Sequence, residues 1–386
     1  MDRKIKYGAF TTIAQTIRQF MLPALIYLND HGYDITIGAK YHDVEVANFP
    51  KNLNYKELDL DRGFHLWKTI KNIFVLYKFF KQEKFDMIEY GTENVSMCAS
   101  VAGWAARVPI RIYNHWGARY VGYTGFPRLI SYVIEKICAI FSTDILQQTQ
   151  KNLEMCIADG IYPREKVRVL GYGGTMGADF KKFDRSKKEE WSSTFKKKYG
   201  IPEGDLVFGD VGFVRKDKGS NELIEAFKNL NDPHCWLVFV GEIYDIDLPD
   251  KDLLDWAKAS DRVIFTGKVM DVEHYLAAYD VLVHPSYREG LGMVLQEAGA
   301  FGIPNITTNI PGPSEFGYDG KTGLIVEVKN AKDLEDKMRY LLEHRELIPQ
   351  MSEEVYKLTE ERYERSKMIK RVYDHREELL KKYKIK

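Results

Sequence analysis

Two glutamates that stand eight positions apart form the clearest chemical pattern in the 386-residue sequence. Glu289 is followed directly by Gly290, Leu291 and Gly292, and Glu297 comes five residues later. Carboxylate oxygens accept hydrogen bonds from the hydroxyl groups of a sugar or a ribose. Backbone N–H groups at the start of a helix bind phosphate. The pattern therefore favours a site for a phosphorylated sugar or a nucleotide.

A strand, a loop and a helix must position these residues. The apolar run Val281–Val283 predicts a buried strand, residues 284–292 predict a loop, and the apolar spacing from Met293 predicts a helix. Because helical side chains lean toward the helix N-terminus, we expect Glu297 to reach back toward the loop that carries Glu289. Both carboxylates should then face one pocket at the C-terminal end of the strand, where open α/β sheets bind ligands.

A basic loop lies upstream of this motif. The apolar run 206–212 predicts a strand, and the loop 213–219 that follows it contains Lys218 directly before a glycine. Ser220 or Asn221 is the expected cap of the next helix. A basic loop with a glycine before a helix N-terminus suits a diphosphate, which both the charge and the helix dipole attract.

The segment from Asp280 to Pro304 resembles the Glu-x7-Glu signature of retaining glycosyltransferases of the GT-B fold, specifically glycosyltransferase family four. Pro311-Gly312 and residues 320–323 extend the similarity. The resemblance covers nearly the whole chain and is stronger in its C-terminal half. It implies an α/β protein of two Rossmann-like domains, with parallel sheets that face a deep cleft and a C-terminal helix that crosses back to the first domain.

The resemblance also implies roles for the residues of the motif. Glu297 would hold the ribose of the nucleotide. Glu289 would line the donor sugar and its diphosphate, together with Gly290, Leu291 and Gly292.

Further roles follow in the same way for the upstream loop. Lys218 corresponds to a family lysine that neutralises the leaving diphosphate together with an arginine, which in the family follows a glycine. That glycine is Gly212 here, but the arginine position holds Phe213, so Arg215 is the expected replacement. Val269, which follows a later predicted strand, would contact the nucleobase.

His115 is a further catalytic candidate, in the first half of the chain. Many family members place a histidine directly before a glycine, beside the donor sugar. Here Trp116 holds that position, before Gly117, and the histidine comes one residue earlier. Because successive strand side chains point to opposite faces, His115 lies either in the site or in the core, and both alternatives stay open.

The resemblance predicts two domains. Residues 1–170 with 366–386 would bind the acceptor, and residues 171–365 would bind the nucleotide sugar. The stretch 171–180, with four glycines, is the predicted hinge. No GxGxxG motif follows the first predicted strand, which argues against a dinucleotide site and hence against a dehydrogenase.

The charge of the chain is zero overall but unevenly distributed. Residues 1–170 contain 22 Lys and Arg against 17 Asp and Glu, and the remainder contains 34 against 39. The basic N-terminal part suggests an anionic partner there. The predicted helix Phe64–Lys81 carries four lysines beside many large apolar residues. It is either a helix that lies on a membrane surface or a core helix with a solvated face.

Cysteine usage and hydropathy indicate the compartment. The four cysteines are scattered without CxxC spacing, which suits buried thiols in a reducing cytoplasm. No apolar run approaches the length of a membrane span. We therefore expect a cytoplasmic protein, with attachment to the inner face of the cell membrane as an open alternative.

The resulting functional hypothesis is a retaining glycosyltransferase of surface polysaccharide biosynthesis, such as capsule or exopolysaccharide. It would move a sugar from a nucleotide sugar, most simply a UDP-sugar, to a glycan or polyprenyl-diphosphate-linked acceptor. We expect no metal, since no DxD-type pair of carboxylates is evident, and no other cofactor or nucleic acid. A nucleotide-sugar 2-epimerase and a scaffold that has lost activity are the alternatives.

Overall fold

The computed structural model of the chain describes residues 3–41, 49–59, 66–244 and 247–385. These residues form two units, each with its own hydrophobic core. The first unit comprises residues 1–176 and 366–386, and the second comprises residues 177–365. The division between them falls inside the glycine-rich stretch 171–180.

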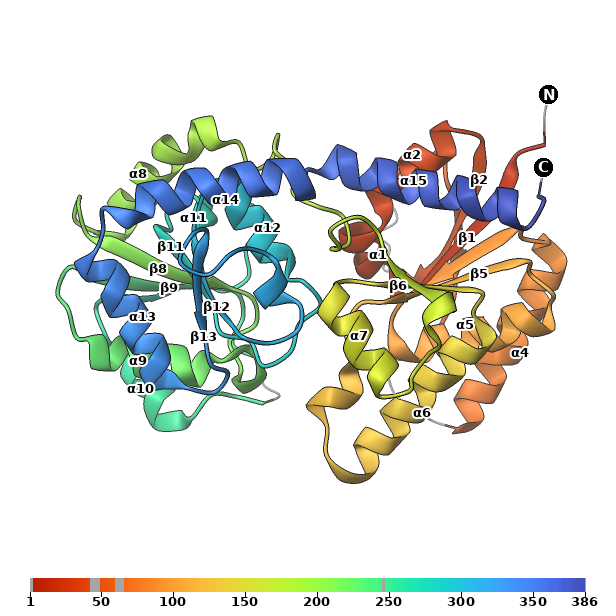
Figure 1. Ribbon diagram of the computed structural model, residues 1–386, viewed down its shortest axis with the longest axis horizontal. Helices are drawn as coiled ribbons and strands as arrows, with labels where there is room; N and C mark the ends of the chain where they lie inside the picture. Colours follow the sequence, from red (N-terminus) through yellow and green to blue (C-terminus); the bar gives the residue numbers. More distant parts are fainter. Residues whose placement is uncertain (1–2, 42–48, 60–65, 245–246, 386) are drawn as a thin grey trace. The chain divides into compact units, whose positions relative to one another are not determined.

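A seven-stranded sheet forms the centre of the first unit (Figure 1). Its strand order is β3-β2-β1-β4-β5-β6-β7, and every neighbouring pair is parallel. The strands are β1 (Ile5–Ile13), β2 (Tyr33–Lys40), β3 (Asn54–Glu57), β4 (Met87–Tyr90), β5 (Ile110–His115), β6 (Asp144–Gln147) and β7 (Val167–Val169). Strands β4, β5 and β6 are buried on both faces, as parallel sheets covered by helices require.

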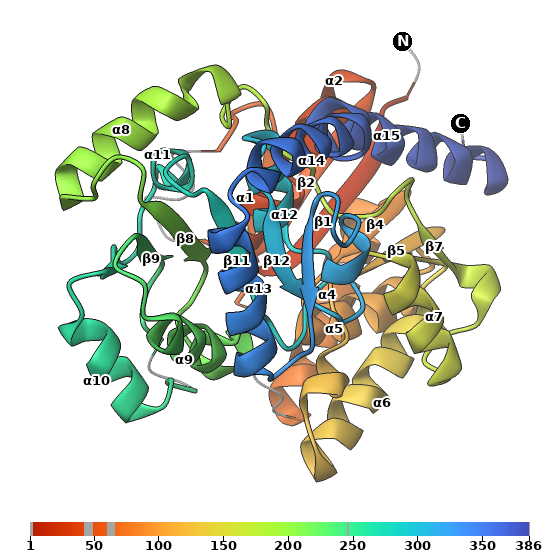
Figure 2. The same ribbon diagram turned by 60° about the vertical axis from the view of Figure 1, so that its left-hand side comes forward.

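Helices cover both faces of this sheet. One face packs against α1 (Ala14–Phe20), α2 (Leu22–Asp30) and α15 (Arg365–Lys382). The other packs against α4 (Leu66–Glu83), α5 (Glu93–Ala105), α6 (Gly125–Phe141) and α7 (Gln150–Ala158). Figure 2 shows α4, α5 and α6 side by side. The expected start of α4 at Phe64 lies outside the described residues.

The first helical segment of the chain is interrupted. Its apolar spacing alone predicts a single helix over Ile17–Leu28, but α1 ends at Phe20 and α2 begins at Leu22. Pro23 stands in the first turn of α2. A proline is tolerated at the start of a helix but breaks its interior, because it has no N–H group and its ring clashes with the preceding turn.

The second unit repeats the same architecture with six parallel strands in the order β10-β9-β8-β11-β12-β13. They are β8 (Leu206–Val211), β9 (Cys235–Val240), β10 (Val263–Phe265), β11 (Val281–His284), β12 (Asn305–Thr308) and β13 (Gly323–Val326). One face packs against α9 (Ser220–Leu230), α10 (Lys251–Ala259) and α13 (Ala331–Glu343). The other packs against α8 (Lys188–Tyr199), α11 (Val272–Leu276), α12 (Met293–Ala300) and α14 (Leu347–Tyr363).

The predicted strand, loop and helix around Glu289 are confirmed as β11, residues 285–292 and α12. The two sheets with their helices also confirm the predicted α/β class. No described helix combines the length and the apolar character that crossing a lipid bilayer demands.

Candidate active site

An ion pair joins the two predicted functional loops of the second unit. Lys218 Nζ lies 2.5 Å from Glu289 Oε2. The two side chains are about a quarter exposed, at 22% and 24%. The structure therefore brings together two residues that are 71 positions apart in the sequence and leaves both accessible to a ligand.

Close backbone packing holds the two loops together. Gly219 has φ +75°, and a Cβ atom there would lie 2.1 Å from the carbonyl oxygen of Pro285. Only glycine fits this position, since any side chain would push the loops apart. The Tyr287 N–H donates to the Asp217 carbonyl at 3.0 Å, which adds a second link. This packing explains why a glycine follows Lys218 in the sequence.

Glu289 is ionised. Burial alone would raise the pKa of its carboxyl group, but Lys218 and His284 outweigh burial and hold that pKa well below its usual range. His284 Nε2 lies 3.7 Å from the same Oε2 atom that pairs with Lys218. The group is thus a fixed negative charge that can accept hydrogen bonds but cannot donate one near neutral pH.

The loop amides between Glu289 and α12 are the predicted phosphate cradle. Gly290, Leu291 and Gly292 are all buried. The N–H groups of Leu291 and Gly292 donate no hydrogen bond within the described part of the chain. Gly312 supports the loop from behind, because a Cβ atom there would lie 1.8 Å from the Gly290 carbonyl oxygen.

Glu297 differs from Glu289 in its surroundings. It lies in the second turn of α12 and is partly buried, and its carboxylate forms no hydrogen bond or ion pair with the described residues. Burial raises its pKa to about 7, against the weaker opposite effects of Lys182 and Arg365. The charged groups that shift the two pKa values differ: Lys218 and His284 act on Glu289, and Lys182, Arg365 and Glu273 act on Glu297. That both face one ligand stays a prediction.

Arg215 is held away from the Lys218–Glu289 pair. Its Nε atom lies 2.5 Å from Asp217 Oδ1, and its second nitrogen donates to Oδ2 at 3.0 Å. Arg288, the neighbour of Glu289, binds the same carboxylate at 3.1 Å. Two guanidinium groups thus share the Asp217 carboxylate, and the Asp247 carboxylate accepts a hydrogen bond from the Asp217 N–H at 3.1 Å.

Gly212 and Val269 follow β8 and β10, the two strands on either side of β9. Gly212 follows β8, and its carbonyl oxygen would lie only 1.9 Å from a Cβ atom on Gly241, so the two backbones are in close contact. Val269 follows β10 and packs partly buried against the core. A groove of about 510 Å³ lies between them, lined by Gly241, Glu242, Ile243, Tyr244, Phe265 and Gly267. Phe213 borders it, with its ring 4.7 Å from that of Tyr244.

Comparisons with known proteins agree with this geometry. Residues 192–358 match the family described as glycosyl transferases group 1. The chain is 29% identical to the capsular polysaccharide biosynthesis glycosyltransferase CapM of Staphylococcus aureus, over 78% of this chain and 77% of that protein. It is 24% identical to the N,N'-diacetylbacillosaminyl-diphospho-undecaprenol alpha-1,3-N-acetylgalactosaminyltransferase of Campylobacter jejuni, over 89% of this chain and 91% of that protein.

The fold comparison extends over both units. The crystal structure of Anabaena Alr3699/HepE in complex with UDP superposes with a TM-score of 0.78 at 16% identity, over 97% of this chain and 100% of that chain. Residues 192–358 thus match glycosyltransferases, and the whole chain has the GT-B fold of such enzymes.

For His115 of the glycosyltransferase, the structure favours the core alternative. Its side chain is 2% exposed, and Nε2 lies 3.3 Å from Glu135 Oε2, which is equally buried. Gln147 lies 3.1 Å from the other ring nitrogen. Burial lowers the pKa of His115, but Glu135 and Cys156 outweigh burial and raise it to about 10. The neighbouring Trp116 packs on Phe20 instead, with ring centroids 5.2 Å apart.

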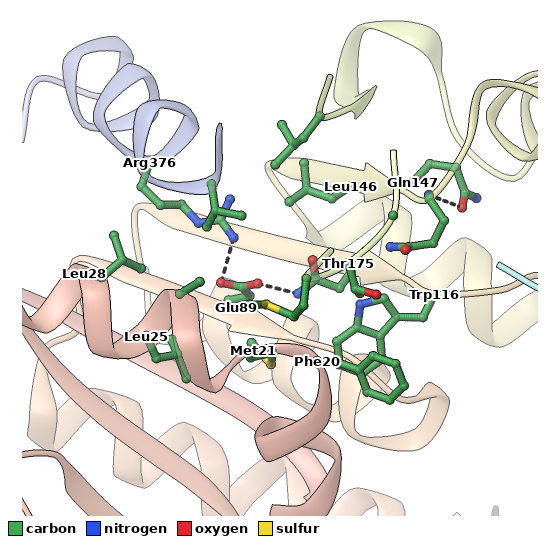
Figure 3. A pocket seen from close by; sticks show the side chains of 17 residues that line it. Phe20, Met21, Leu25, Leu28, Glu89, Trp116, Leu146, Gln147, Thr175 and Arg376 are labelled. Atoms are coloured by element: carbon green, nitrogen blue, oxygen red, sulfur yellow. Dashed lines mark hydrogen bonds and ion pairs between the residues drawn. The ribbon is translucent and has the colours of Figure 1, made fainter. Parts of the chain in front are cut away.

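A small pocket lies at the strand ends of the first unit (Figure 3). Glu89 forms its floor and is held by Arg376 of α15 at 2.8 Å and by Asn114 at 2.6 Å. Apolar side chains such as Leu25 and Leu28 form one wall. Its volume of about 40 Å³ suits a few water molecules and is too small for a sugar ring.

Sequence reasoning missed the residues behind Glu289. Asp210 and His284 are buried directly beneath it, and a charged residue in the otherwise apolar strand β8 was the available signal. It also missed Arg288 and Asp217 as partners of Arg215. Within the described residues, no three His, Cys, Asp or Glu side chains converge as a metal site would require.

Proposed function

We propose that the glycosyltransferase moves a sugar from a UDP-sugar to a polyprenyl-diphosphate-linked or glycan acceptor in surface polysaccharide biosynthesis, with retention of anomeric configuration. The observation that carries the proposal is the accessible Lys218–Glu289 pair beside the unpaired amides of Leu291 and Gly292. A cation, a fixed carboxylate and two free amides are what a sugar diphosphate needs.

Each of these groups has a distinct role in binding the donor. Lys218 and the loop amides stabilise the charge that develops on the leaving diphosphate. Glu289 accepts hydrogen bonds from the sugar hydroxyls. The Glu297 carboxylate makes no hydrogen bond or ion pair with the part of the chain that the structure describes, which suits the two hydroxyls of a ribose. The base lies in the groove beside Gly212 and Val269, where its plane stacks near Tyr244.

The donor and the acceptor class are supported by the related proteins. Alr3699/HepE was crystallised with UDP, and the Campylobacter jejuni relative is named as acting on a diphospho-undecaprenol acceptor. CapM is named for capsular polysaccharide biosynthesis. The first unit is the acceptor side in this proposal, because residues 1–170 carry the excess of positive charge that an acceptor diphosphate would attract.

A surface of the first unit suits a lipid-linked acceptor. Helices α4 and α6, which flank α5, expose large apolar side chains that include Trp67 at 82%, Phe74 at 56% and Phe126 at 72%. Lys71 and Lys78 are exposed on α4 among them. Apolar and cationic side chains on one surface bind an anionic bilayer, so we place this face against the inner membrane surface. Sedimentation with anionic and with neutral vesicles tests this part separately.

Retention and independence from metal are further parts of the proposal. The resemblance of the motif to family four supports retention. The Lys218 ammonium group and the amides of Leu291 and Gly292 support binding of a diphosphate without a metal ion. NMR of the newly formed linkage would reveal the anomer, and transfer measured with and without EDTA tests the metal.

A panel of nucleotide sugars tests the function as a whole. The melting temperature should rise with UDP and at least one UDP-sugar, because a ligand that binds only the folded state stabilises it. That donor should then lose its sugar to a polyprenyl-diphosphate-linked sugar. Conversion of the donor without any acceptor would instead indicate an epimerase. Binding without transfer to any acceptor in the panel would contradict the proposal and favour a scaffold.

A further inference from the structure

His284 lies between two carboxylates in the second unit. It ends β11, and its Nδ1 atom lies 3.5 Å from Asp210 Oδ1, while Nε2 lies 3.7 Å from Glu289 Oε2. Asp210 belongs to β8, which pairs directly with β11. The side chains of His284 and Asp210 are 4% and 3% exposed. The three groups thus form a row that leads from the sheet to the accessible Glu289.

Only a charged imidazole satisfies this arrangement. A neutral ring has one N–H donor and one acceptor nitrogen, so it would turn a lone pair toward one of the two carboxylates. An imidazolium instead has one N–H group to turn toward each carboxylate. Asp210, Glu289 and Lys218 are the charged groups that act on His284 in the described part of the chain. Burial and Lys218 lower its pKa, but the two carboxylates outweigh them and raise it.

Lys218 and His284 converge on the same oxygen of Glu289. In the proposed function, Lys218 also neutralises the diphosphate of the donor, and one ammonium group then divides its hydrogen bonds between two anions. A lysine side chain is flexible and can turn toward the phosphate. Glu289 would lose much of its cationic support at the moment when it must hold the sugar.

We propose that Asp210 and His284 are positioning residues that hold the Glu289 carboxylate in place while Lys218 turns to the diphosphate. His284 lies behind Glu289 and does not touch the donor. Both ring nitrogens lack a hydrogen bond within the described residues, and the present distances exceed hydrogen-bond length. The contact to Glu289 therefore has room to shorten when Lys218 withdraws. This inference rests on the proposed function of Lys218 and Glu289.

The charge of His284 is tested directly in the wild-type protein. Histidine-selective ¹⁵N NMR, with the signal assigned by comparison with His284→Gln, should show His284 protonated on both nitrogens at pH 8. A neutral ring at pH 8 overturns the inference. This measurement needs no substrate, so its failure is distinct from a failure of the proposed function, which would appear as no UDP release from any UDP-sugar.

The positioning role is tested with Asp210→Asn. Without the Asp210 charge, the pKa of His284 should fall toward its ordinary value of about 6.5, so the imidazolium is present at pH 6 and lost as the pH rises. The ratio of wild-type to variant kcat should then grow about 20-fold between pH 6 and pH 8. The affinity for UDP should change less than about twofold, because Lys218 remains.

A matched control lies at the other end of the same strand. Asp205 precedes β8 and also pairs with a histidine, His234, at 3.2 Å. Asp205→Asn should leave the kcat ratio flat across the same pH range. A flat ratio for Asp210→Asn, at any overall level of kcat, would overturn the positioning role, since a merely structural defect does not follow the titration of His284.

Discussion

Two buried histidines, one in each unit, stand at the C-terminal end of a parallel strand beside a glutamate. His115 ends β5 and pairs with Glu135, and His284 ends β11 and pairs with Glu289. In the first pair both side chains are 2% exposed, while Glu289 is 24% exposed and also binds Lys218. A buried charge pair alone therefore does not identify a binding site. The Lys218–Glu289 site is distinguished by a carboxylate that remains exposed enough to contact a ligand.

The largest expected effect lies in the enclosed pair. Glu135→Gln should lower the free energy of unfolding by about 3 kcal/mol at pH 7, because it removes the partner of a buried charge. Urea unfolding followed by circular dichroism measures this, and transfer per folded molecule should stay near the wild-type level. As a control, Glu154→Gln removes an exposed pair with Arg164 in the same unit and should leave the urea unfolding curve close to that of the wild type.

The stability difference between the wild type and Glu135→Gln should depend on pH. The pKa of His115 is raised to about 10 in the folded state, so its pair with Glu135 stabilises fully below about pH 6.5. That contribution is lost as the pH rises toward 10. The stability gap between wild type and Glu135→Gln should therefore narrow over this range. A gap that stays constant would contradict the raised pKa of His115, and a variant that is stable but inactive would place the pair in the catalytic machinery.

In the accessible Lys218–Glu289 pair, a substitution should reduce activity rather than stability. Glu289→Gln should lower kcat/KM by about 10²- to 10³-fold, as for other groups that stabilise a transition state electrostatically. Its effect on stability should stay within about 1 kcal/mol, because the pair is partly solvated. Initial rates of UDP release with saturating acceptor, beside urea unfolding, separate the two effects. A variant that loses stability instead of activity would make Glu289 the counterpart of Glu135.

Replacing Glu297 should make the protein more stable and weaken its binding of the donor. The pKa of the Glu297 carboxyl group is raised to about 7 in the folded state. Between about pH 4.5 and pH 7 the folded state therefore keeps a proton that the unfolded state has released. The free energy of unfolding falls as the pH rises through this range. Glu297→Gln should therefore stabilise the protein by about 2 kcal/mol at pH 8 and by little at pH 5. The same variant should raise the KM for the donor about tenfold, through the loss of hydrogen bonds to the ribose. Unchanged KM would remove Glu297 from the site.

The smallest effect should come from Arg215. Asp217 already binds its guanidinium group through two contacts, so Arg215→Ala should weaken UDP binding less than about threefold. Lys218→Ala should weaken it by at least about tenfold, because a charge-assisted hydrogen bond to phosphate contributes about 1.5–3 kcal/mol. Calorimetric titration with UDP measures both. Equal losses of UDP affinity in the two variants would support Arg215 as the replacement for the family arginine, whose position Phe213 occupies here.

Local features of the site could be predicted from the sequence. The apolar run before His284, the glycines of the loop and the helix from Met293 follow from residue type and spacing, and β11 and α12 lie where they were predicted. The family resemblance assigned Lys218 and Glu289 to the same donor diphosphate but did not predict their ion pair. The sequence alone could not supply that contact, because the two residues are 71 positions apart.

The remaining features depend on which strands are neighbours. Asp210 lies beneath His284 only because β8 pairs with β11, and no local pattern encodes that order. The same holds for His115, whose partner Glu135 comes from α6. Strand alternation left open whether His115 faces the site or the core. Its pair with the buried Glu135 carboxylate favours the core. The break between α1 and α2 was predictable from Pro23, and the apolar spacing concealed it.

In the proposed function, the Lys218–Glu289 pair forms the donor site. A UDP complex of the wild-type protein, analysed by ³¹P NMR and calorimetry beside Lys218→Ala and the matched surface variant Lys228→Ala, is the most direct test. UDP should bind the wild type and Lys228→Ala alike, with a shifted β-phosphate signal that is lost in Lys218→Ala. A β-phosphate signal and an affinity that Lys218→Ala leaves unchanged would contradict it.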